Sequence, residues 1–144
     1  MIVATTGHRD LKFPYEVWKE LKSDLLSVLR SNNTTTVIGG MALGWDTFFA
    51  DTCIAAGIPF YAYVPYKGQG PTSPLYNSIL NKSAQIIYCA EGYAPRVFLD
   101  RNDRMLDSAN LLVAFWDPTI LKGGTFYTVN RARKMGMEIV NLWK

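Results

Sequence analysis

Three glycine clusters, each placed after a short apolar run, constrain the fold of this chain more than any other feature. The clusters are Thr6-Gly7-His8-Arg9, the segment from Gly39 to Asp46, and Gly123-Gly124-Thr125. A glycine turn between a strand and a helix exposes free backbone N–H groups at the positive end of the helix dipole, which suits a phosphate group. Three such turns in one chain predict a composite site for a nucleotide-like anion.

Strands and helices are expected to alternate along the whole sequence. Apolar and β-branched runs predict strands at 1–6, 35–38, 58–64, 85–89, 111–115 and 138–142. Amphipathic spacing and helix-ending glycines predict helices at 14–30, 44–56, 75–82, 95–108 and 124–135, and a loop is expected at 65–74. This order predicts an α/β fold, an open and mostly parallel sheet with helices on both faces. Ligands bind such sheets outside the carboxyl ends of the strands.

Composition sets broad limits on the kind of protein. The chain has 144 residues, 49% of them hydrophobic and 19% charged, which predicts one globular domain over 1–144. The net charge of +3 permits an anionic small ligand without requiring nucleic acid. Cys53 and Cys89 lie in apolar runs and are expected to be buried free thiols of a reducing compartment. No stretch approaches a membrane span, and Arg9 interrupts the N-terminal apolar run too early for a signal peptide, so we expect a cytoplasmic protein with no membrane contact.

The second glycine cluster is the strongest local signal. Gly39, Gly40 and Gly44 let the backbone approach a ligand, although a tight strand–helix turn without a ligand would use the same residues. Their spacing is neither a dinucleotide fingerprint nor a P-loop, and no metal-ligand spacing occurs, so no cofactor and no metal are expected. Asp46, in the first turn of the next helix, either interacts with the helix dipole, holds a ribose hydroxyl or polarises a water molecule.

His8 and Arg9 leave the first strand directly over the expected site. His8 is the only histidine and a candidate acid or base, although a turn-stabilising role needs no partner group. Arg9 is a candidate anion contact because a guanidinium fork matches phosphate oxygens. Among the aromatic residues, Tyr66 and Trp116 follow strand ends and can stack on a base, with plain packing as the alternative.

Two further groups complete the candidate ligand-binding set. Arg101 and Asn102 precede the fifth strand, where they either contact the ligand or belong to a solvated, charged helix face. Gly123, Gly124 and Thr125 open the last helix, where backbone N–H groups and a hydroxyl can bind phosphate or merely form a capped turn.

Taken together, these motifs resemble the SLOG superfamily, which includes YpsA-like proteins, the DNA-processing protein DprA and the LOG phosphoribohydrolases. The resemblance covers nearly the whole chain and depends on the order and spacing of 6–9, 39–46, 101–102 and 123–125. It implies a Rossmann-like fold that binds nucleotides or nucleotide-derived ligands, often as a homodimer. We therefore also expect a homo-oligomer.

One motif departs from the LOG pattern. LOG enzymes carry Pro-Gly-Gly-x-Gly-Thr-x-x-Glu with a catalytic Glu, whereas this chain lacks the leading proline and one glycine and has Thr128 at the Glu position. Cleavage of an N-glycosidic bond would need another carboxylate, for which Asp46 and Asp103 are candidates.

Three functional hypotheses follow. The first is a domain that binds a nucleotide-like small molecule and hydrolyses its N-glycosidic bond, with Asp46 and His8 as catalytic candidates. The second is a sensor or sponge for a nucleotide signal, with the same pocket and no catalytic group. The third is a DprA-like nucleic-acid-binding module, for which a modest basic patch is available, although the small net charge argues against it: Lys122, Arg131, Arg133 and Lys134.

Overall fold

A single six-stranded parallel sheet forms the centre of the molecule, with strand order β4-β3-β2-β1-β5-β6. The computed structural model describes residues 1–69 and 72–144, so residues 70–71 of the predicted loop lie outside the described residues. The strands are β1 Ile2–Gly7, β2 Thr36–Gly39, β3 Phe60–Val64, β4 Gln85–Tyr88, β5 Leu111–Phe115 and β6 Glu138–Asn141.

Within the described residues, five helices alternate with the strands. They are α1 Tyr15–Ser31, α2 Trp45–Ala55, α3 Pro74–Lys82, α4 Val97–Asp107 and α5 Gly123–Lys134. The predicted α/β fold is confirmed, and the predicted boundaries differ from the observed ones by at most two residues. Pro14 precedes α1 in an extended conformation and does not belong to the first turn, whereas Gly123 already belongs to α5.

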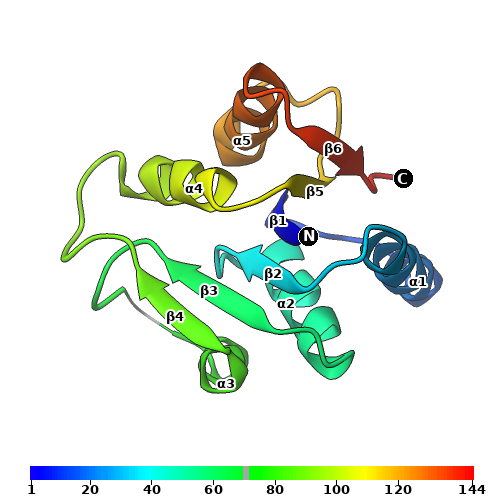
Figure 1. Cartoon of the computed structure of the whole chain (residues 1–144), viewed down its shortest axis with the longest axis horizontal. Helices are drawn as coiled ribbons and strands as arrows, with labels where there is room; N and C mark the ends of the chain where they lie inside the picture. Colours follow the sequence, from blue (N-terminus) through cyan, green and yellow to red (C-terminus); the bar gives the residue numbers. More distant parts are fainter. Residues whose placement is uncertain (70–71) are drawn as a thin grey trace.

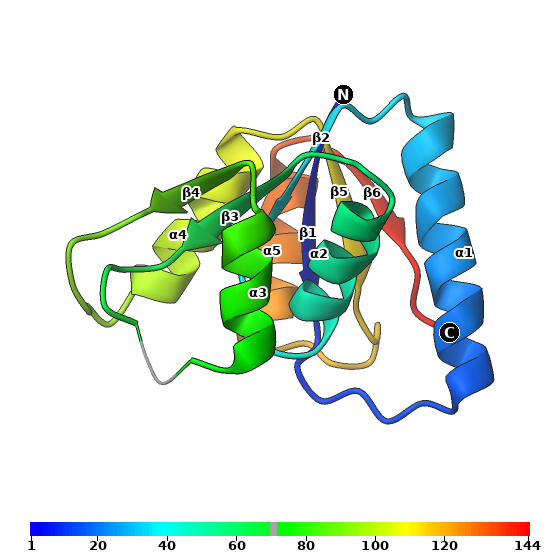
Figure 2. The same ribbon diagram turned by 90° about the horizontal axis from the view of Figure 1, so that it is seen from below.

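The direction in which the chain crosses the sheet decides which face each helix covers. From β1 to β4 the chain moves outward on one side, and it then returns to place β5 against the other edge of β1. Since parallel crossovers are almost always right-handed, this reversal puts α1, α2 and α3 on one face and α4 and α5 on the other (Figures 1 and 2). The strand order therefore reverses between β1 and β5, and the carboxyl ends of these two strands border a crevice.

Each face of the sheet has its own apolar core. On one face, Leu21, Leu25 and Leu29 of α1 pack with Trp45 and Phe49 of α2. Apolar residues of α4 and α5 pack on the opposite face against the alternate side chains of the same strands: Met105, Leu106, Val129 and Ala132 against Ala4, Ile38, Leu112 and Ala114. Burial on both faces explains why the central strands are continuously apolar, as expected for a parallel sheet.

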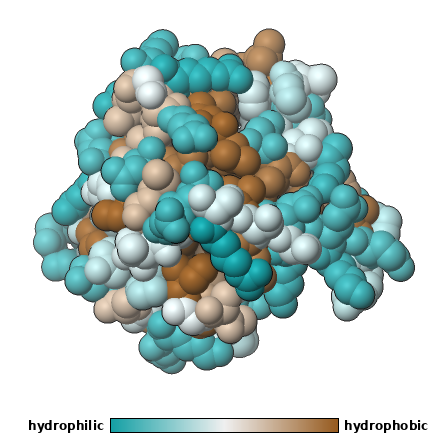
Figure 3. Space-filling model, turned by 45° about the vertical axis from the view of Figure 1, so that its right-hand side comes forward, coloured by the Kyte–Doolittle hydropathy of each residue, from teal (hydrophilic) through white to brown (hydrophobic). Residues whose placement is uncertain are grey.

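A cluster of aromatic rings packs beside the loop that leaves β1. Phe13 and Trp143 lie edge to face with ring centroids 5.7 Å apart, and Phe115 stacks on Trp45 at 4.8 Å. Figure 3, which views the side that carries α1 and the C-terminus, shows apolar side chains gathered near the middle of this face with hydrophilic ones around them. The cluster fixes the loop that leaves β1, since Trp143 also contacts His8 with 5.6 Å between ring centroids.

The two cysteines differ in burial. Cys53 belongs to α2 and is fully buried in the core, whereas Cys89 is only partly buried after β4, which corrects the expectation that both thiols are buried. Burial raises the pKa of the Cys53 thiol to about 12, so it stays protonated and unreactive. None of the helices in the described parts of the chain is long and apolar enough to span a membrane.

Candidate functional site

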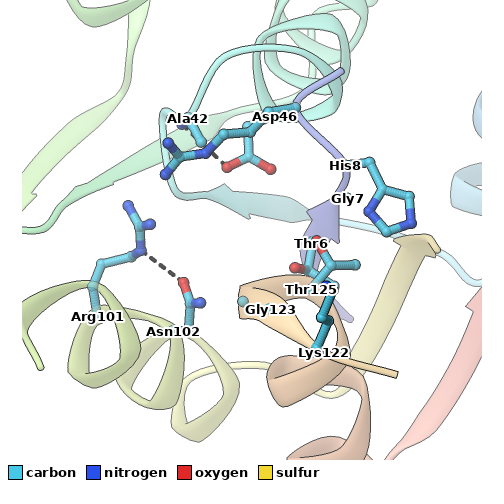
Figure 4. Close-up of a pocket in the computed structure, with 12 residues that line it drawn as sticks. Thr6, Gly7, His8, Ala42, Asp46, Arg101, Asn102, Lys122, Gly123 and Thr125 are labelled. Atoms are coloured by element: carbon cyan, nitrogen blue, oxygen red, sulfur yellow. Dashed lines mark hydrogen bonds between the residues drawn. The ribbon is translucent and has the colours of Figure 1, made fainter. Parts of the chain in front are cut away.

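A polar cleft of about 280 Å³ lies at the carboxyl ends of β1 and β5, where the strand order reverses. Its walls come from the loop after β1, the start of α2, the middle of α4 and the start of α5 (Figure 4). Nine of the residues selected from the sequence line it: Gly7, His8, Arg9, Asp46, Arg101, Asn102, Gly123, Gly124 and Thr125. The first and third glycine clusters therefore meet at one place, together with the carboxylate that follows the second.

The N-terminus of α5 forms one wall of the cleft. The first N–H groups of a helix have no acceptor within the helix, and no side chain of residues 1–69 or 72–144 caps this end. Gly124 leaves the space in front of these groups open: a Cβ there would meet only the Asn102 amide nitrogen, at 4.0 Å. Lys122, directly before the helix, adds a positive charge beside the positive end of the dipole. This wall has the features of an anion-binding site.

Asp46 faces this wall from the start of α2. One carboxylate oxygen, Oδ2, accepts the Ala42 backbone N–H at 3.2 Å. The other, Oδ1, is buried and has no hydrogen-bond partner among residues 1–69 and 72–144. Burial raises the pKa of Asp46 to about 6, against the opposing effects of Arg101, the Ala42 N–H and Arg9. A buried acceptor without a partner costs free energy, so Oδ1 is a candidate contact for a ligand hydroxyl or N–H.

Arg101 of α4 is buried, and its hydrogen bonds connect α4 to the ends of β2 and β3. Its guanidinium donates to the Gly40 carbonyl, to the Tyr63 carbonyl at 3.3 Å, and from Nε to Asn102 Oδ1 at 2.8 Å. The bond to Asn102 turns the Asn102 amide nitrogen toward α5, where it adds a donor to the cleft. Arg101 thus contributes positive charge to the cleft and also a structural clamp between β2, β3 and α4.

The glycines of the second cluster do not line this cleft. A Cβ on Gly39 would lie 2.7 Å from the Phe60 ring, and one on Gly40 would lie 2.8 Å from the Arg101 guanidinium carbon. Gly44 has a φ of +80° and lies against the Arg9 backbone. Close packing within the protein accounts for the absence of a side chain at all three positions, as the tight-turn alternative predicts.

His8 lies at the rim of the cleft with one ring nitrogen occupied. Its Nε2 accepts the Asp117 backbone N–H at 2.8 Å, and burial lowers the pKa of the imidazole despite the nearby Asp117 carboxylate. The neutral ring with an accepting Nε2 ties the loop after β1 to the loop after β5. This is the geometry of the turn-stabilising role that the sequence left open beside the catalytic one.

Three cleft residues were not selected as ligand contacts from the sequence. Ala42 contributes a backbone N–H, Thr6 is the residue before the last one of β1, and Lys122 was expected only in a basic patch. For Thr6 and Lys122, the available signal in the sequence was their position at the start of the first glycine cluster and directly before the third. The Ala42 contact depends on the fold of the loop and has no sequence signature.

Asp46 and Asp103, the two candidate replacements for the missing catalytic Glu, have different surroundings. At the Glu position itself, Thr128 is buried, and its hydroxyl donates to the Gly124 carbonyl at 2.9 Å within α5. Asp103 accepts the Tyr127 hydroxyl at 2.9 Å and pairs with Arg131 at 3.0 Å between α4 and α5. Asp103 is therefore engaged outside the cleft, and Asp46 is the carboxylate in contact with it.

Comparison with known proteins supports the fold. No protein-family model and no curated protein matches this sequence. Among solved structures, DprA from Streptococcus pneumoniae has a TM-score of 0.72 and 15% identity, covering 95% of this chain and 48% of DprA. DprA from Helicobacter pylori, described with its single-stranded DNA binding mode, has a TM-score of 0.72 and 17% identity, covering 96% and 63%. This chain thus spans about half to two thirds of the length of the DprA proteins it resembles.

A carrier of a small cofactor has the same fold. The molybdenum cofactor (Moco) carrier protein from Chlamydomonas reinhardtii has a TM-score of 0.61 and 18% identity, covering 98% of this chain and 74% of the carrier. These solved structures share the fold of this chain at 15–18% identity, so the Rossmann-like fold expected from the motifs is confirmed, including its similarity to DprA. One of these proteins thus binds single-stranded DNA, and another carries the molybdenum cofactor.

Proposed function

We propose that this protein binds the phosphate group of a nucleotide or nucleotide-derived small molecule at the N-terminus of α5. The observation that carries the proposal is the uncapped helix end facing a buried Asp46 oxygen that has no partner in the described parts of the chain. The helix end favours an anion, and Asp46 favours a hydrogen-bond donor. A sugar phosphate supplies both groups in one molecule, with the phosphate at Gly123–Thr125 and a hydroxyl at Asp46.

The charges around the cleft suit such a ligand. Arg9, Arg101 and Lys122 surround it, and among the described residues Asp46 is the single carboxylate in its lining. The Asn102 amide and the Thr125 hydroxyl can donate further hydrogen bonds. An excess of cations and neutral donors around one carboxylate matches a ligand that is anionic at one end and carries hydroxyl groups at the other.

Reversing the charge of Lys122 tests the phosphate contact. We expect Lys122→Glu to weaken binding of ribose 5-phosphate by more than about tenfold, because a charge-assisted contact is lost and a repulsion replaces it. Lys134→Glu is the matched control, since it makes the same charge change at the opposite end of α5, about 18 Å away and beyond the screening length. Calorimetry showing equal losses in both variants would indicate general electrostatics without a site at α5.

Hydrolysis of an N-glycosidic bond is the catalytic form of this proposal. Asp46 has a pKa of about 6, which lets it exist in both protonation states near neutral pH and act on a water or a leaving group. Incubation with a panel of nucleoside monophosphates, followed by chromatography, should then release free base. Absence of released base together with measurable binding would favour the sensor or sponge.

Binding of nucleic acid remains the alternative from a different class, and the structural similarity to DprA favours it. The basic residues that would carry it are partly engaged: Arg131 pairs with Asp103, and Arg133 lies over the Trp116 ring at 5.2 Å. Binding of single-stranded DNA that falls steeply with salt and weakens equally in Lys122→Glu and Lys134→Glu would support this alternative.

A further inference from the structure

A second cavity adjoins the polar cleft and differs from it in character. Its volume is about 440 Å³, within the range of about 300–1,000 Å³ in which small-molecule sites fall. Its lining is mainly apolar and includes Met41 from the loop after β2, Tyr76 from α3 and Phe98 from α4. Arg9 and Ala42 line both cavities, so the two spaces meet at these residues.

The place where the two cavities meet is also where the sugar of the proposed ligand would lie. Ala42 donates its N–H to Asp46, so the Asp46 carboxylate is anchored at the boundary between the two cavities. Met41, just before it, has a φ of +65°, which is strained for a residue with a side chain. This strained loop holds Ala42 between the polar cleft and the apolar cavity.

The apolar cavity carries the features of a site for a flat heterocycle. The Phe98 ring is partly buried and lies edge to face with Tyr66, with 6.3 Å between ring centroids. The side-chain oxygen of Gln69 is buried and has no hydrogen-bond partner among the described residues. Aromatic rings stack on any of the nucleobases. An amide oxygen without a partner favours an N–H group of the base, either in its ring or on an exocyclic nitrogen.

We infer that the apolar cavity binds the heterocyclic base of the same ligand whose phosphate lies at α5, with the sugar at Asp46 and Ala42. The inference depends on the proposed function, because it takes its orientation from the phosphate site. It names the ligand class more closely: a nucleoside monophosphate or a similar molecule with a planar, N–H-bearing ring. It also places the bond between base and sugar beside Asp46.

Comparison of nucleoside monophosphates with ribose 5-phosphate, on the wild-type protein and on Phe98 variants, tests this inference. By calorimetry, at least one of AMP, GMP, CMP and UMP should bind the wild-type protein at least about fivefold more tightly than ribose 5-phosphate, since stacking of a base contributes that much or more. In Phe98→Ala this advantage should disappear while the affinity for ribose 5-phosphate is unchanged. Phe98→Tyr keeps the ring and should keep the advantage.

The possible results separate the two proposals. If ribose 5-phosphate binds and no monophosphate binds more tightly, the base site is wrong and the phosphate site stands. If Phe98→Ala retains its melting temperature and the base advantage, the base lies elsewhere. If neither ligand binds the wild-type protein, the proposed function fails, and the inference fails with it. Tyr15→Ala, an exposed aromatic truncation at the start of α1, should leave both affinities unchanged.

Discussion

Replacement of Gly44 with alanine should destabilise the protein by at least about 3 kcal/mol, a large part of the stability of a small domain. Gly44 has φ +80° and ψ −121°, a region in which only glycine is unstrained. A Cβ there would also lie 2.3 Å from the Arg9 carbonyl oxygen, a backbone atom that cannot move without shifting the loop after β1. Urea denaturation at neutral pH measures the loss.

Gly57→Ala is the matched control for Gly44→Ala. Gly57 has nearly the same φ, +79°, but a Cβ there would meet no atom within 4 Å. The decrease in the free energy of unfolding in Gly57→Ala should therefore reflect backbone strain alone, about 1–2 kcal/mol. Equal losses in the two variants would show that the contact with Arg9 is not a constraint.

The Gly44 contact also bears on ligand binding. The Trp45 N–H donates to the His8 carbonyl at 3.1 Å, so the start of α2 and the loop after β1 are joined at two adjacent points. This joint positions Arg9 and Asp46 on the same side of the cleft. A folded fraction of Gly44→Ala should accordingly bind sugar phosphates more weakly than the wild-type protein.

Replacement of Asp46 with asparagine should make the unliganded protein more stable at pH 8, by up to about 3 kcal/mol. Burial raises the pKa of Asp46 from an ordinary value of 3.8 to about 6. Between about pH 4 and pH 6 the folded state thus binds more protons than the unfolded state, and the free energy of unfolding falls as the pH rises. Asparagine cannot ionise, so this fall should be absent from the variant.

Denaturant titrations at pH 4, 6 and 8 measure the difference between the two proteins. The gap in unfolding free energy should widen across this interval and stay constant above about pH 7. A gap that does not change with pH would mean that Asp46 titrates normally and that its carboxylate is solvated.

The same variant separates the roles of Asp46 in function. If Asp46 holds a sugar hydroxyl, the affinity for ribose 5-phosphate should fall about tenfold, the value of a charge-assisted hydrogen bond. If it is a catalytic carboxylate, turnover should disappear while binding survives. If it only stabilises the helix, neither should change. We expect the first result, because Asp46 lines the cleft and its buried Oδ1 has no hydrogen-bond partner in the described parts of the chain. Unchanged affinity would contradict it.

Local patterns in the sequence were sufficient for the architecture. The alternation of apolar strands and amphipathic helices determines a parallel sheet covered on both faces, because each element must bury its apolar side. The glycine clusters mark the carboxyl ends of the strands, and parallel strands bring those ends to one edge. That is why Gly7, Asp46, Asn102 and Gly124, distant in the sequence, could be assigned to one cleft in advance.

Only the tertiary structure decided what each residue does at that edge. Gly39, Gly40 and Gly44 accommodate Phe60, Arg101 and the Arg9 backbone, which are neighbours from other elements. The burial of Asp46, the clamp formed by Arg101 and the cavity beside Phe98 likewise depend on contacts between elements. A sequence pattern specifies which face of an element is apolar and where its backbone turns. Which atoms then meet across the crevice is determined by packing, and packing sets the charge state and accessibility of every group in the site.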